Sequence, residues 1–318
     1  MKLGIPYMGS KRQIADKIVD FVLRENPNCK YVWDLFGGGG ALSFEFLQRE
    51  QIKKVYYNEL NTGVVELLRK IKKDGVTKDF YQWIDRDTFM KHKNDNSWFG
   101  GLCKTIWSFG NSQNSYLFGK DSEEYKKNYH LVVVEGVDKT KEMMSYAEKY
   151  VLEKYGINEK CELVMPIKEN IQDRRLEVRG QLNIFEKKCK LNQQKSRSGL
   201  KDLQRLQQLE QLQQLERLER LQQLERLEIF NSSYKDVPIT SPIEETIIIL
   251  DPPYKDAKKY QCEIDYEELY EYMRNSLYKV YMCEYEAPFK KVFEVKHRST
   301  LSATNNNKST NECLFCNE

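Results

Sequence analysis

The sequence has few of the residues on which several common chemistries depend. Among its 318 residues are three histidines, His92, His130 and His297, and none of them lies beside a nucleophile motif. It also has no run of about 18 apolar residues, so we expect no transmembrane helix and no membrane partner. The N-terminus lacks the apolar core of a signal peptide. These absences argue against histidine-based catalysis and against insertion into a bilayer.

The eight cysteines are scattered along the chain. A long chain without a signal peptide is expected to be cytoplasmic and to keep its thiols reduced. Cys313 and Cys316 form a single C-x-x-C, whereas a structural zinc site needs four ligands. No second C-x-x-C or pair of histidines is available. We therefore expect no metal, and we expect these two cysteines to lie on one face of a C-terminal strand.

Charge of either sign is not in excess. The 51 Lys and Arg residues nearly balance the 48 Asp and Glu residues, for a net charge of +3. This balance excludes a polybasic protein that binds nucleic acid through bulk charge, so any such surface must be a local patch. At 40% apolar and 31% charged residues, the chain is polar for a globular protein, and the excess polarity should lie in particular segments.

Both ends of the chain show the alternation of strands and helices that is typical of an α/β fold. Continuous apolar runs indicate buried strands, and apolar residues at helical spacing indicate helices. We predict strands at 31–34, 55–59, 246–250 and 279–283, and helices from about Lys11 and at 41–49, 64–71 and 265–275. This order predicts a doubly wound parallel sheet.

The middle of the chain differs in composition. Residues 187–200 contain five basic residues and no acidic residue. From Leu200 to Leu227 a leucine recurs at every third position, which makes ten leucines. Because a helix turns by about 100° per residue, this spacing moves the leucines around the helix and does not give a coiled-coil seam. A solenoid-like coil and a helix buried on several sides both fit this leucine tract, and its balanced charges favour a scaffold or spacer.

A glycine loop follows the first predicted strand. Asp34-Leu35-Phe36 leads into Gly37–Gly40, and glycines at such a turn let the backbone approach a ligand closely. No Gly-Lys-Ser/Thr follows, so this is not a Walker loop. About twenty residues later the second strand ends at Glu59, where a carboxylate can accept hydrogen bonds from ribose hydroxyls. Taken alone, the loop is also typical of a tight turn and Glu59 of an exposed acid.

The most specific motif is Asp251-Pro252-Pro253-Tyr254, directly after the apolar strand at 246–250. Two prolines fix the direction of the backbone carbonyls at the carboxyl end of a strand, where open α/β sheets bind their ligands. The carboxylate accepts hydrogen bonds and the tyrosine presents a flat face. This set suits a planar ring that carries an exocyclic amino group.

Together these motifs resemble the Dam-like N6-adenine DNA methyltransferases, which use S-adenosylmethionine. Residues 6–11 look like the N-terminal cofactor motif, 34–40 like the glycine loop, 58–61 like the ribose motif, 251–254 like the catalytic motif and 232–234 like the short adenine-side motif. Residues 107–119 resemble the segment near the start of the target-recognition insert. The motifs follow the family's order, and the resemblance covers roughly residues 1–120 and 228–316.

This resemblance implies a Rossmann-like S-adenosylmethionine-dependent methyltransferase sheet with an inserted, mainly helical target-recognition domain. The core would comprise residues 1–95 and 228–318, and the insert 96–227, including the leucine tract. The catalytic residues would be Asp251, Pro252, Pro253 and Tyr254. The cofactor would contact Tyr7, Lys11, Asp34, Phe36, Gly37, Gly39, Glu59, Ser233, Tyr234 and Asp251.

The expected activity is methyl transfer to N6 of adenine in double-stranded DNA, with the base flipped out of the duplex. Lys104, Asn111, Gln113 and Asn114 have side chains that can read base edges. The basic residues Lys187, Lys188, Lys190, Lys195 and Arg197 would neutralise phosphates, although such a run is equally typical of a solvated loop. We expect a monomer on DNA and consider a cognate restriction endonuclease as a partner. A catalytically silent DNA-binding relative and a methyltransferase acting on RNA or protein are the alternatives.

Overall fold

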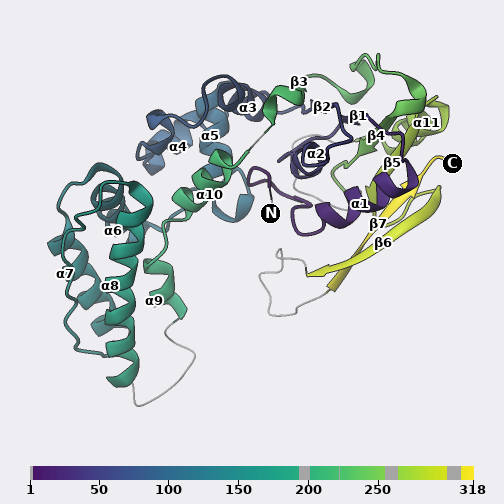
Figure 1. Ribbon diagram of the computed structural model, residues 1–318. Coiled ribbons are helices and arrows are strands. Elements are labelled where there is room, and N and C mark those ends of the chain that lie inside the picture. Colours follow the sequence, from purple (N-terminus) through teal and green to yellow (C-terminus); the bar gives the residue numbers. More distant parts are fainter. Residues whose placement is uncertain (1–2, 193–200, 222, 255–263, 299–308) are drawn as a thin grey trace. The chain divides into compact units, whose positions relative to one another are not determined.

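The core of the chain is a seven-stranded sheet, seen here in a computed structural model that describes residues 3–192, 201–221, 223–254, 264–298 and 309–318 (Figure 1). The strand order is β3-β2-β1-β4-β5-β7-β6. The strands are β1 (Tyr31–Asp34), β2 (Lys54–Asn58), β3 (Leu227–Phe230), β4 (Thr246–Leu250), β5 (Lys279–Glu284), β6 (Lys290–Arg298) and β7 (Ser309–Cys316). The first five strands in this order run parallel, and β7 lies antiparallel between β5 and β6. The predicted doubly wound parallel sheet is confirmed, and the antiparallel hairpin is added to it.

Strand β4 lies at the centre of this sheet. All five of its residues are buried, and it pairs in parallel with β1 on one side and β5 on the other. A parallel strand covered on both faces has no solvent-facing side, which explains why its sequence, Thr-Ile-Ile-Ile-Leu, does not alternate between apolar and polar residues. β1 and β4 therefore lie side by side although about 200 residues separate them (Figure 1).

Helices cover the two faces of the sheet. On one face, Leu269 and Met273 of α11 (Tyr266–Asn275) pack into a core with Trp33 and Ile248. On the other, α1 (Ala15–Glu25) packs against α2 (Ala41–Leu47) and reaches β6. The predicted first helix begins at Ala15, later than Lys11, because the preceding segment lies against the glycine loop, with the Ile5 amide donating to the Gly39 carbonyl at 2.8 Å.

The chain divides into two compact units. The sheet unit contains Met1–Thr77, Asp87–Ser115 and Gln214–Glu318, and the helical unit contains Lys78–Arg86 and Tyr116–Gln213. The predicted boundaries at 96 and 227 differ from this division. The first lies later than predicted because α5 (Trp98–Ile106) packs directly on α3 (Thr62–Asp74). A Cβ on Gly101 would lie 2.0 Å from the Gly63 carbonyl oxygen. The two glycines thus bring the helix backbones into contact and keep this segment with the sheet.

The described part of the helical unit contains no strand, as the prediction of a mainly helical insert requires. Its helices are α6 (Lys120–His130), the π-helical turn Leu131–Glu135, α7 (Thr140–Tyr155), α8 (Ile171–Asn192) and α9 (Lys201–Leu206). Helices α4 (Arg86–His92) and α10 (Glu210–Glu219) each have residues in both units. Among the described residues, one short 3₁₀ turn, Lys78–Tyr81, lies in the helical unit, and four others lie in the sheet unit: Phe109–Asn111, Leu224–Arg226, Tyr234–Asp236 and Ile243–Glu245.

The leucine tract forms α9, α10, a 3₁₀ turn and strand β3. Its buried members are Leu203, Leu206, Leu209, Leu212, Leu215, Leu218, Leu221 and Leu227. Leu224 is only half-buried, and Leu200 lies outside the described residues. Short helices buried on several sides are therefore the structure of this tract, as the drift of a three-residue period around a helix requires. Strand β3 at its end was not predicted.

A buried lysine binds the backbone between helices α9 and α10. The Lys126 ammonium, 4% exposed, donates hydrogen bonds to the carbonyls of Arg205 and Gln208. Arg205 lies in the last turn of α9 and Gln208 just after it, where helix carbonyls lack amide donors from a following turn, so a buried cation can supply hydrogen bonds to them. Burial lowers the pKa of Lys126 to about 8, and the nearby Glu210 carboxylate opposes that shift.

The two cysteines of the C-x-x-C both lie in β7, so their predicted position in a C-terminal strand is confirmed. The prediction that they share a face is wrong. Cys313 pairs with Glu284 and Cys316 with Tyr281 in an unbroken register, and residues three apart in a regular strand point to opposite faces. Within the described residues, no group of three or more His, Cys, Asp or Glu side chains is arranged to hold a metal ion.

No helix in the described ranges combines the length and the hydropathy that crossing a membrane requires.

Because the leucines of the tract are buried to different degrees, their replacement by alanine should lower the free energy of unfolding by different amounts. Leu215 is 0% exposed, so Leu215→Ala should lower the free energy of unfolding by about 2–5 kcal/mol through lost burial and a cavity. The half-buried Leu224 serves as the matched control, and Leu224→Ala should cost about 1 kcal/mol or less. Urea unfolding of both variants measures the difference. Equal losses would show that the tract does not contribute to the core as described.

Candidate active site

A cavity of about 460 Å³ opens at the carboxyl ends of β1, β2 and β4. The chain leaves β1 towards β2 on one side, whereas β4 lies on the other, so the strand order reverses at this point. Open α/β sheets bind ligands at such a switch point because the loops on either side diverge and leave a crevice. The predicted cofactor and catalytic residues all line this cavity: Tyr7, Lys11, Asp34, Phe36, Gly37, Gly39, Glu59, Ser233, Tyr234 and Asp251–Tyr254.

The glycine loop forms one wall of the cavity, and the structure gives a reason for its glycines that the sequence did not. A Cβ on Gly37 would lie 2.1 Å from the ring of Tyr57, and one on Gly39 would lie 2.5 Å from the Ile5 carbonyl oxygen. We expected a close approach of ligand to backbone. The atoms that approach most closely belong instead to the protein itself, to strand β2 and to the N-terminal segment.

Asp34 is the last residue of β1 and directly precedes this loop. One of its carboxylate oxygens accepts a hydrogen bond. Ser43 donates to its Oδ2 at 2.6 Å, whereas the buried Oδ1 has no hydrogen-bond partner among the described residues. The side chain is 2% exposed. Burial raises the pKa of Asp34 to about 7, because desolvation penalises the carboxylate more than the Ser43 bond stabilises it. An unpartnered carboxylate oxygen in a cavity wall is suited to a cationic ligand group.

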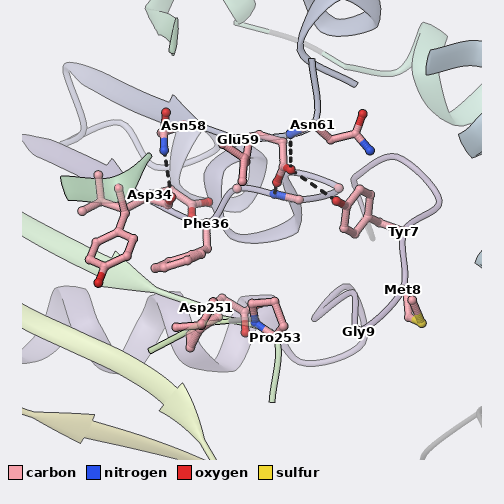
Figure 2. A pocket seen from close by; sticks show the side chains of 18 of the residues that line it. Tyr7, Met8, Gly9, Asp34, Phe36, Asn58, Glu59, Asn61, Asp251 and Pro253 are labelled. Atoms are coloured by element: carbon pink, nitrogen blue, oxygen red, sulfur yellow. Dashed lines mark hydrogen bonds between the residues drawn. The ribbon is translucent and has the colours of Figure 1, made fainter. Parts of the chain in front are cut away.

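Glu59 lies just beyond β2 and is held by its own chain (Figure 2). Its carboxylate accepts hydrogen bonds from the backbone amides of Gly38 and Asn61, both at 2.8 Å, and from the Tyr7 hydroxyl at 3.3 Å. It is 9% exposed, and burial raises its pKa. A carboxylate has about four lone-pair sites, so these contacts orient Glu59 and leave acceptor capacity towards the cavity.

Next to residues 232–235, the cavity wall contains an aromatic pair, Tyr234 and Phe36. The rings of Tyr234 and Phe36 lie 5.2 Å apart at 33°, and Tyr272 meets Tyr234 edge-on. The side chain of Asn58 fixes this segment, because it donates to the carbonyls of Leu35 and Ser232, both at 3.0 Å. The wall is apolar and flat, which suits a planar ring.

The opposite side of the cavity is formed by residues 251–254, as Figure 2 shows for Asp251 and Pro253 below Asp34 and Phe36. The Tyr266 hydroxyl of α11 lies 2.7 Å from the Pro253 carbonyl oxygen and 2.5 Å from Glu284 Oε2, two acceptors that share its one hydrogen. Asp251 is 19% exposed at its side chain. Burial raises the pKa of Asp251 to about 6, although the Lys11 ammonium acts in the opposite direction. Near neutral pH the group is therefore mainly a carboxylate.

Lys11 connects the N-terminal segment to this loop. Its ammonium, 3% exposed, donates hydrogen bonds to Asp251 Oδ1 and to the Tyr254 hydroxyl, each at 2.7 Å. It also lies 3.6 Å from Glu312 Oε1. Burial alone would lower the pKa of Lys11, but the surrounding negative charge, Asp251 foremost, raises it well above the ordinary value. Lys11 was predicted to contact the cofactor; it lines the cavity and is also bonded to Asp251 and Tyr254.

Two residues at this site were not predicted. Glu312 of β7 accepts the Tyr254 hydroxyl at 2.7 Å on both carboxylate oxygens, and Tyr285 stacks on the Tyr254 ring with centroids 4.4 Å apart. One signal was available for Glu312: an acidic residue directly precedes the apolar run Cys313–Cys316 of a buried strand. Buried acids need partners, but the sequence does not reveal which partner.

The residues predicted to contact DNA do not all line the cavity, unlike the predicted cofactor and catalytic residues. Asn114 and Gln113 line the cavity, and Asn111 lies in the turn Phe109–Asn111. Lys104 does not fit the prediction: on α5 it is 6% exposed, and burial lowers its pKa, so it presents no donor to a base edge.

The basic run is in part helical and not a loop. Lys187, Lys188 and Lys190 belong to α8, where Lys190 pairs with Glu186 and Lys188 with Glu162. Lys195 and Arg197 lie outside the described residues. Two of the three described lysines therefore have acidic partners already, so the net positive charge of this helix end is smaller than the sequence suggested.

Comparison with known proteins supplies the family. The sequence model of the D12 class N6 adenine-specific DNA methyltransferases matches residues 7–269, which is well over half of the chain. The matched span includes the N-terminal segment, the glycine loop and residues 251–254. A search of the curated proteins found no match.

The contact between the glycine loop and β2 yields a prediction. Gly37→Ala places a methyl group inside the ring of Tyr57, which is 0% exposed and donates its hydroxyl hydrogen to the Gly38 carbonyl at 2.6 Å. The expected cost is about 1–3 kcal/mol, the usual range for overpacking. Thermal unfolding of single and double variants measures it.

The control for this prediction is the same substitution in the Tyr57→Ala background, where most of the cost should disappear because the colliding ring is gone. Gly180→Ala, in α8 with no atom within 4 Å of the added Cβ, should be neutral or stabilising. If Gly37→Ala is equally costly with and without the Tyr57 ring, the contact is not the reason for the glycine.

Proposed function

The chain belongs to the D12 class N6 adenine-specific DNA methyltransferase family and methylates N6 of adenine in DNA; on this premise, we propose that its methyl donor is S-adenosylmethionine, bound in the cavity at the ends of β1, β2 and β4. The observation that carries the proposal is the convergence of Asp34, Glu59 and Asp251 on this one cavity. The proposal extends to the role of each side chain and to extrusion of the target base.

The residues of the glycine-loop side fit the three parts of this cofactor. Asp34 Oδ1, buried and without a hydrogen-bond partner in the described chain, would accept the ammonium of the methionine moiety. Glu59 would accept hydrogen bonds from the ribose hydroxyls, and the Phe36–Tyr234 wall would pack against the adenine ring. When bound, the cofactor supplies an electrophilic methyl group on a sulfonium.

Asp251 and Pro252 are proposed to activate the adenine amino group, which is a poor nucleophile. The lone pair of an adenine amino group is delocalised into the ring, so the nitrogen is a poor nucleophile. The Asp251 carboxylate and the Pro252 carbonyl would accept its two N–H bonds, which favours a tetrahedral nitrogen and stabilises the positive charge that develops on it. This is electrostatic stabilisation by groups oriented in advance, and holding the nitrogen in place adds the positioning contribution.

The position of Tyr254 bears on base extrusion. A base inside a duplex cannot reach a carboxylate at the bottom of a cavity, so the adenine must leave the helix before it reacts. The Tyr254 ring would stack on the extruded adenine and contribute about 1–3 kcal/mol, as base–aromatic contacts do.

Contacts with DNA outside the cavity are proposed for the helical unit. We assign target recognition to this unit together with the adjoining segment that contains Asn111, Gln113 and Asn114. Phosphate contacts are proposed for the end of α8 and the residues after it: Lys187, Lys188, Lys190, Lys195 and Arg197. The protein would act as a monomer on DNA in the cytoplasm, and a restriction endonuclease of the same specificity would be its counterpart.

The first test of this function is the methylation of DNA in cells that express the protein. Wild type should produce N6-methyladenine at one short sequence, read by long-read sequencing, and Asp251→Ala should reduce methylation by at least about 10²-fold because the developing charge loses its acceptor. Circular dichroism checks that the variant is folded. Wild-type methylation by Asp251→Ala would remove Asp251 from the mechanism, and methylation of RNA or protein in place of DNA would contradict the assigned substrate.

The second test is the pH dependence of cofactor binding. Since the pKa of Asp34 is raised to about 7 by burial and only the carboxylate attracts an ammonium, affinity should be lost as the pH falls through 7. Below that value the dissociation constant of S-adenosylhomocysteine should rise about tenfold per pH unit, the limit for one coupled proton. Isothermal titration calorimetry from pH 5.5 to 8 measures this slope.

Asp34→Asn is the matched control for that slope. The amide keeps the shape of the side chain and cannot titrate, so its affinity should be weaker at pH 8 and independent of pH. A wild-type affinity that does not change across pH 7 would exclude Asp34 as the ammonium acceptor.

A further inference from the structure

Glu312 occupies a place in the structure that neither the motifs nor the proposed roles explain. It lies in β7, opposite Val295 of β6, and is 2% exposed. Both of its carboxylate oxygens accept a hydrogen bond from the Tyr254 hydroxyl, at an O···O distance of 2.7 Å. Its Oε1 also lies 3.6 Å from the Lys11 ammonium nitrogen. A strand near the C-terminus thus contacts both the N-terminal segment and the catalytic loop.

The charges at this place do not cancel. One ammonium, Lys11, faces two carboxylates, Asp251 and Glu312, so the group carries a net charge of −1 when all three are ionised. Without Glu312, Lys11 and Asp251 would form a neutral pair. A neutral pair stabilises a developing positive charge less than a group with a net negative charge does, most of all where burial keeps water away.

Lys11 also selects which oxygen of Asp251 meets the substrate. Its ammonium binds Oδ1 at 2.7 Å, and among the described residues no hydrogen bond reaches Oδ2. Oδ2 is therefore the oxygen left to accept a hydrogen bond from an amine in the cavity. Lys11 is already at full hydrogen-bond distance from Asp251, and Glu312, 3.6 Å from the same ammonium, adds a negative charge that offsets part of the positive charge of Lys11.

Tyr254 is held by the same contacts. Its hydroxyl donates to Glu312 and accepts from Lys11, while its ring stacks on Tyr285 at 4.4 Å. The ring is thus fixed from three directions before any base arrives. A residue whose rotamer is locked in advance loses less entropy when its partner binds.

We propose that Glu312 is a positioning residue for methyl transfer, which orients Tyr254 and offsets the charge of Lys11 so that Asp251 retains its negative potential towards the target amine. Glu312 acts through these neighbours and touches neither substrate nor cofactor. The inference rests on the proposed role of Asp251, and it adds the C-terminal strand to the machinery of the reaction.

The proposal has a consequence for pH dependence. The charged and titratable groups that act on Asp251 are Lys11 from the N-terminal segment and Glu312 from β7. The Asp251 charge in turn raises the pKa of four neighbours: Asp34, Tyr254, Tyr266 and Cys283. Of the two that act on it, Glu312 raises the pKa of Asp251 and Lys11 lowers it. Since the pKa of Asp251 is raised to about 6, we expect the acidic limb of the wild-type rate near that pH. Removing the Glu312 charge should shift this limb to lower pH.

The test compares wild type, Glu312→Gln and Glu312→Asp by the rate of methyl transfer to DNA at saturating cofactor. Glu312→Gln should reduce kcat between about 10-fold and 10²-fold, the loss that misplacing a reacting group by about 1 Å produces, and should move the acidic limb downward. Glu312→Asp keeps the charge and shortens the side chain, so its limb should stay near that of the wild type while kcat falls. A purely structural glutamate would alter stability without moving the limb.

Glu294→Gln is the matched control, because Glu294 is exposed on the neighbouring strand β6 and pairs only locally with Lys291 and Asn311. Its rate and its pH profile should equal those of the wild type. Binding of S-adenosylhomocysteine, measured in parallel, should be unchanged in Glu312→Gln, since Glu312 does not line the cavity.

The outcomes separate the two proposals. If wild type methylates adenine, Asp251→Ala does not, and folded Glu312→Gln shows the wild-type kcat and acidic limb, the inference about Glu312 is wrong and the proposed function stands. If Asp251→Ala is as active as wild type, the assignment of the catalytic motif itself fails. If Glu312→Gln does not fold, the limb of Glu312→Asp decides, because a limb displaced despite the retained charge would overturn the electrostatic role.

Discussion

A buried ammonium joins the parts of this protein that lie farthest apart in its sequence. Lys11 has almost no exposed surface, and its hydrogen bonds end on Asp251 and Tyr254, some 240 residues away. A charge removed from water must be compensated by partners held in good geometry, or the fold loses several kcal/mol. The N-terminal segment, the loop after β4 and the C-terminal strand β7 are therefore required to meet at one place. The cavity, its glycine wall and residues 251–254 lie beside that meeting point.

The parts of the fold that could be predicted are those in which a local pattern has a single physical reading. The isoleucine run of β4 could be identified as a buried parallel strand, because only a strand covered on both faces is apolar throughout. The site could be located because ligands bind at the carboxyl ends of such strands, and the motif residues do line one cavity there.

The remainder depended on partners that no local pattern reveals. Gly37 looked like a position where a ligand approaches, yet the atom that excludes a side chain there belongs to Tyr57. Gly63 and Gly101 carried no signal, yet their contact keeps α5 with the sheet and moves the unit boundary. Lys104 and the lysines of α8 were chosen for their charge, but burial and acidic partners decide whether a charge is available. For Gly37, Gly63, Gly101 and Lys188 the deciding contact joins residues about 20 or more positions apart, whereas Lys190 pairs within its own helix at i,i+4.

The leucine tract shows how one repeat can serve two different units. A period of three moves the apolar positions around the helix, so the tract has no single buried face and needs neighbours on several sides. Its first leucines lie in the helical unit and its last in the sheet unit, where the tract ends as strand β3 at the sheet edge. Because β3 pairs with β2, whose end positions Asn58 and Glu59, the register of the tract is coupled to one wall of the cavity. A shift by one residue along the repeat would replace Leu227 by a polar residue at a position that is 0% exposed. Burial at that position thus excludes a one-residue shift of the tract, whereas a shift by a whole triplet would keep a leucine there.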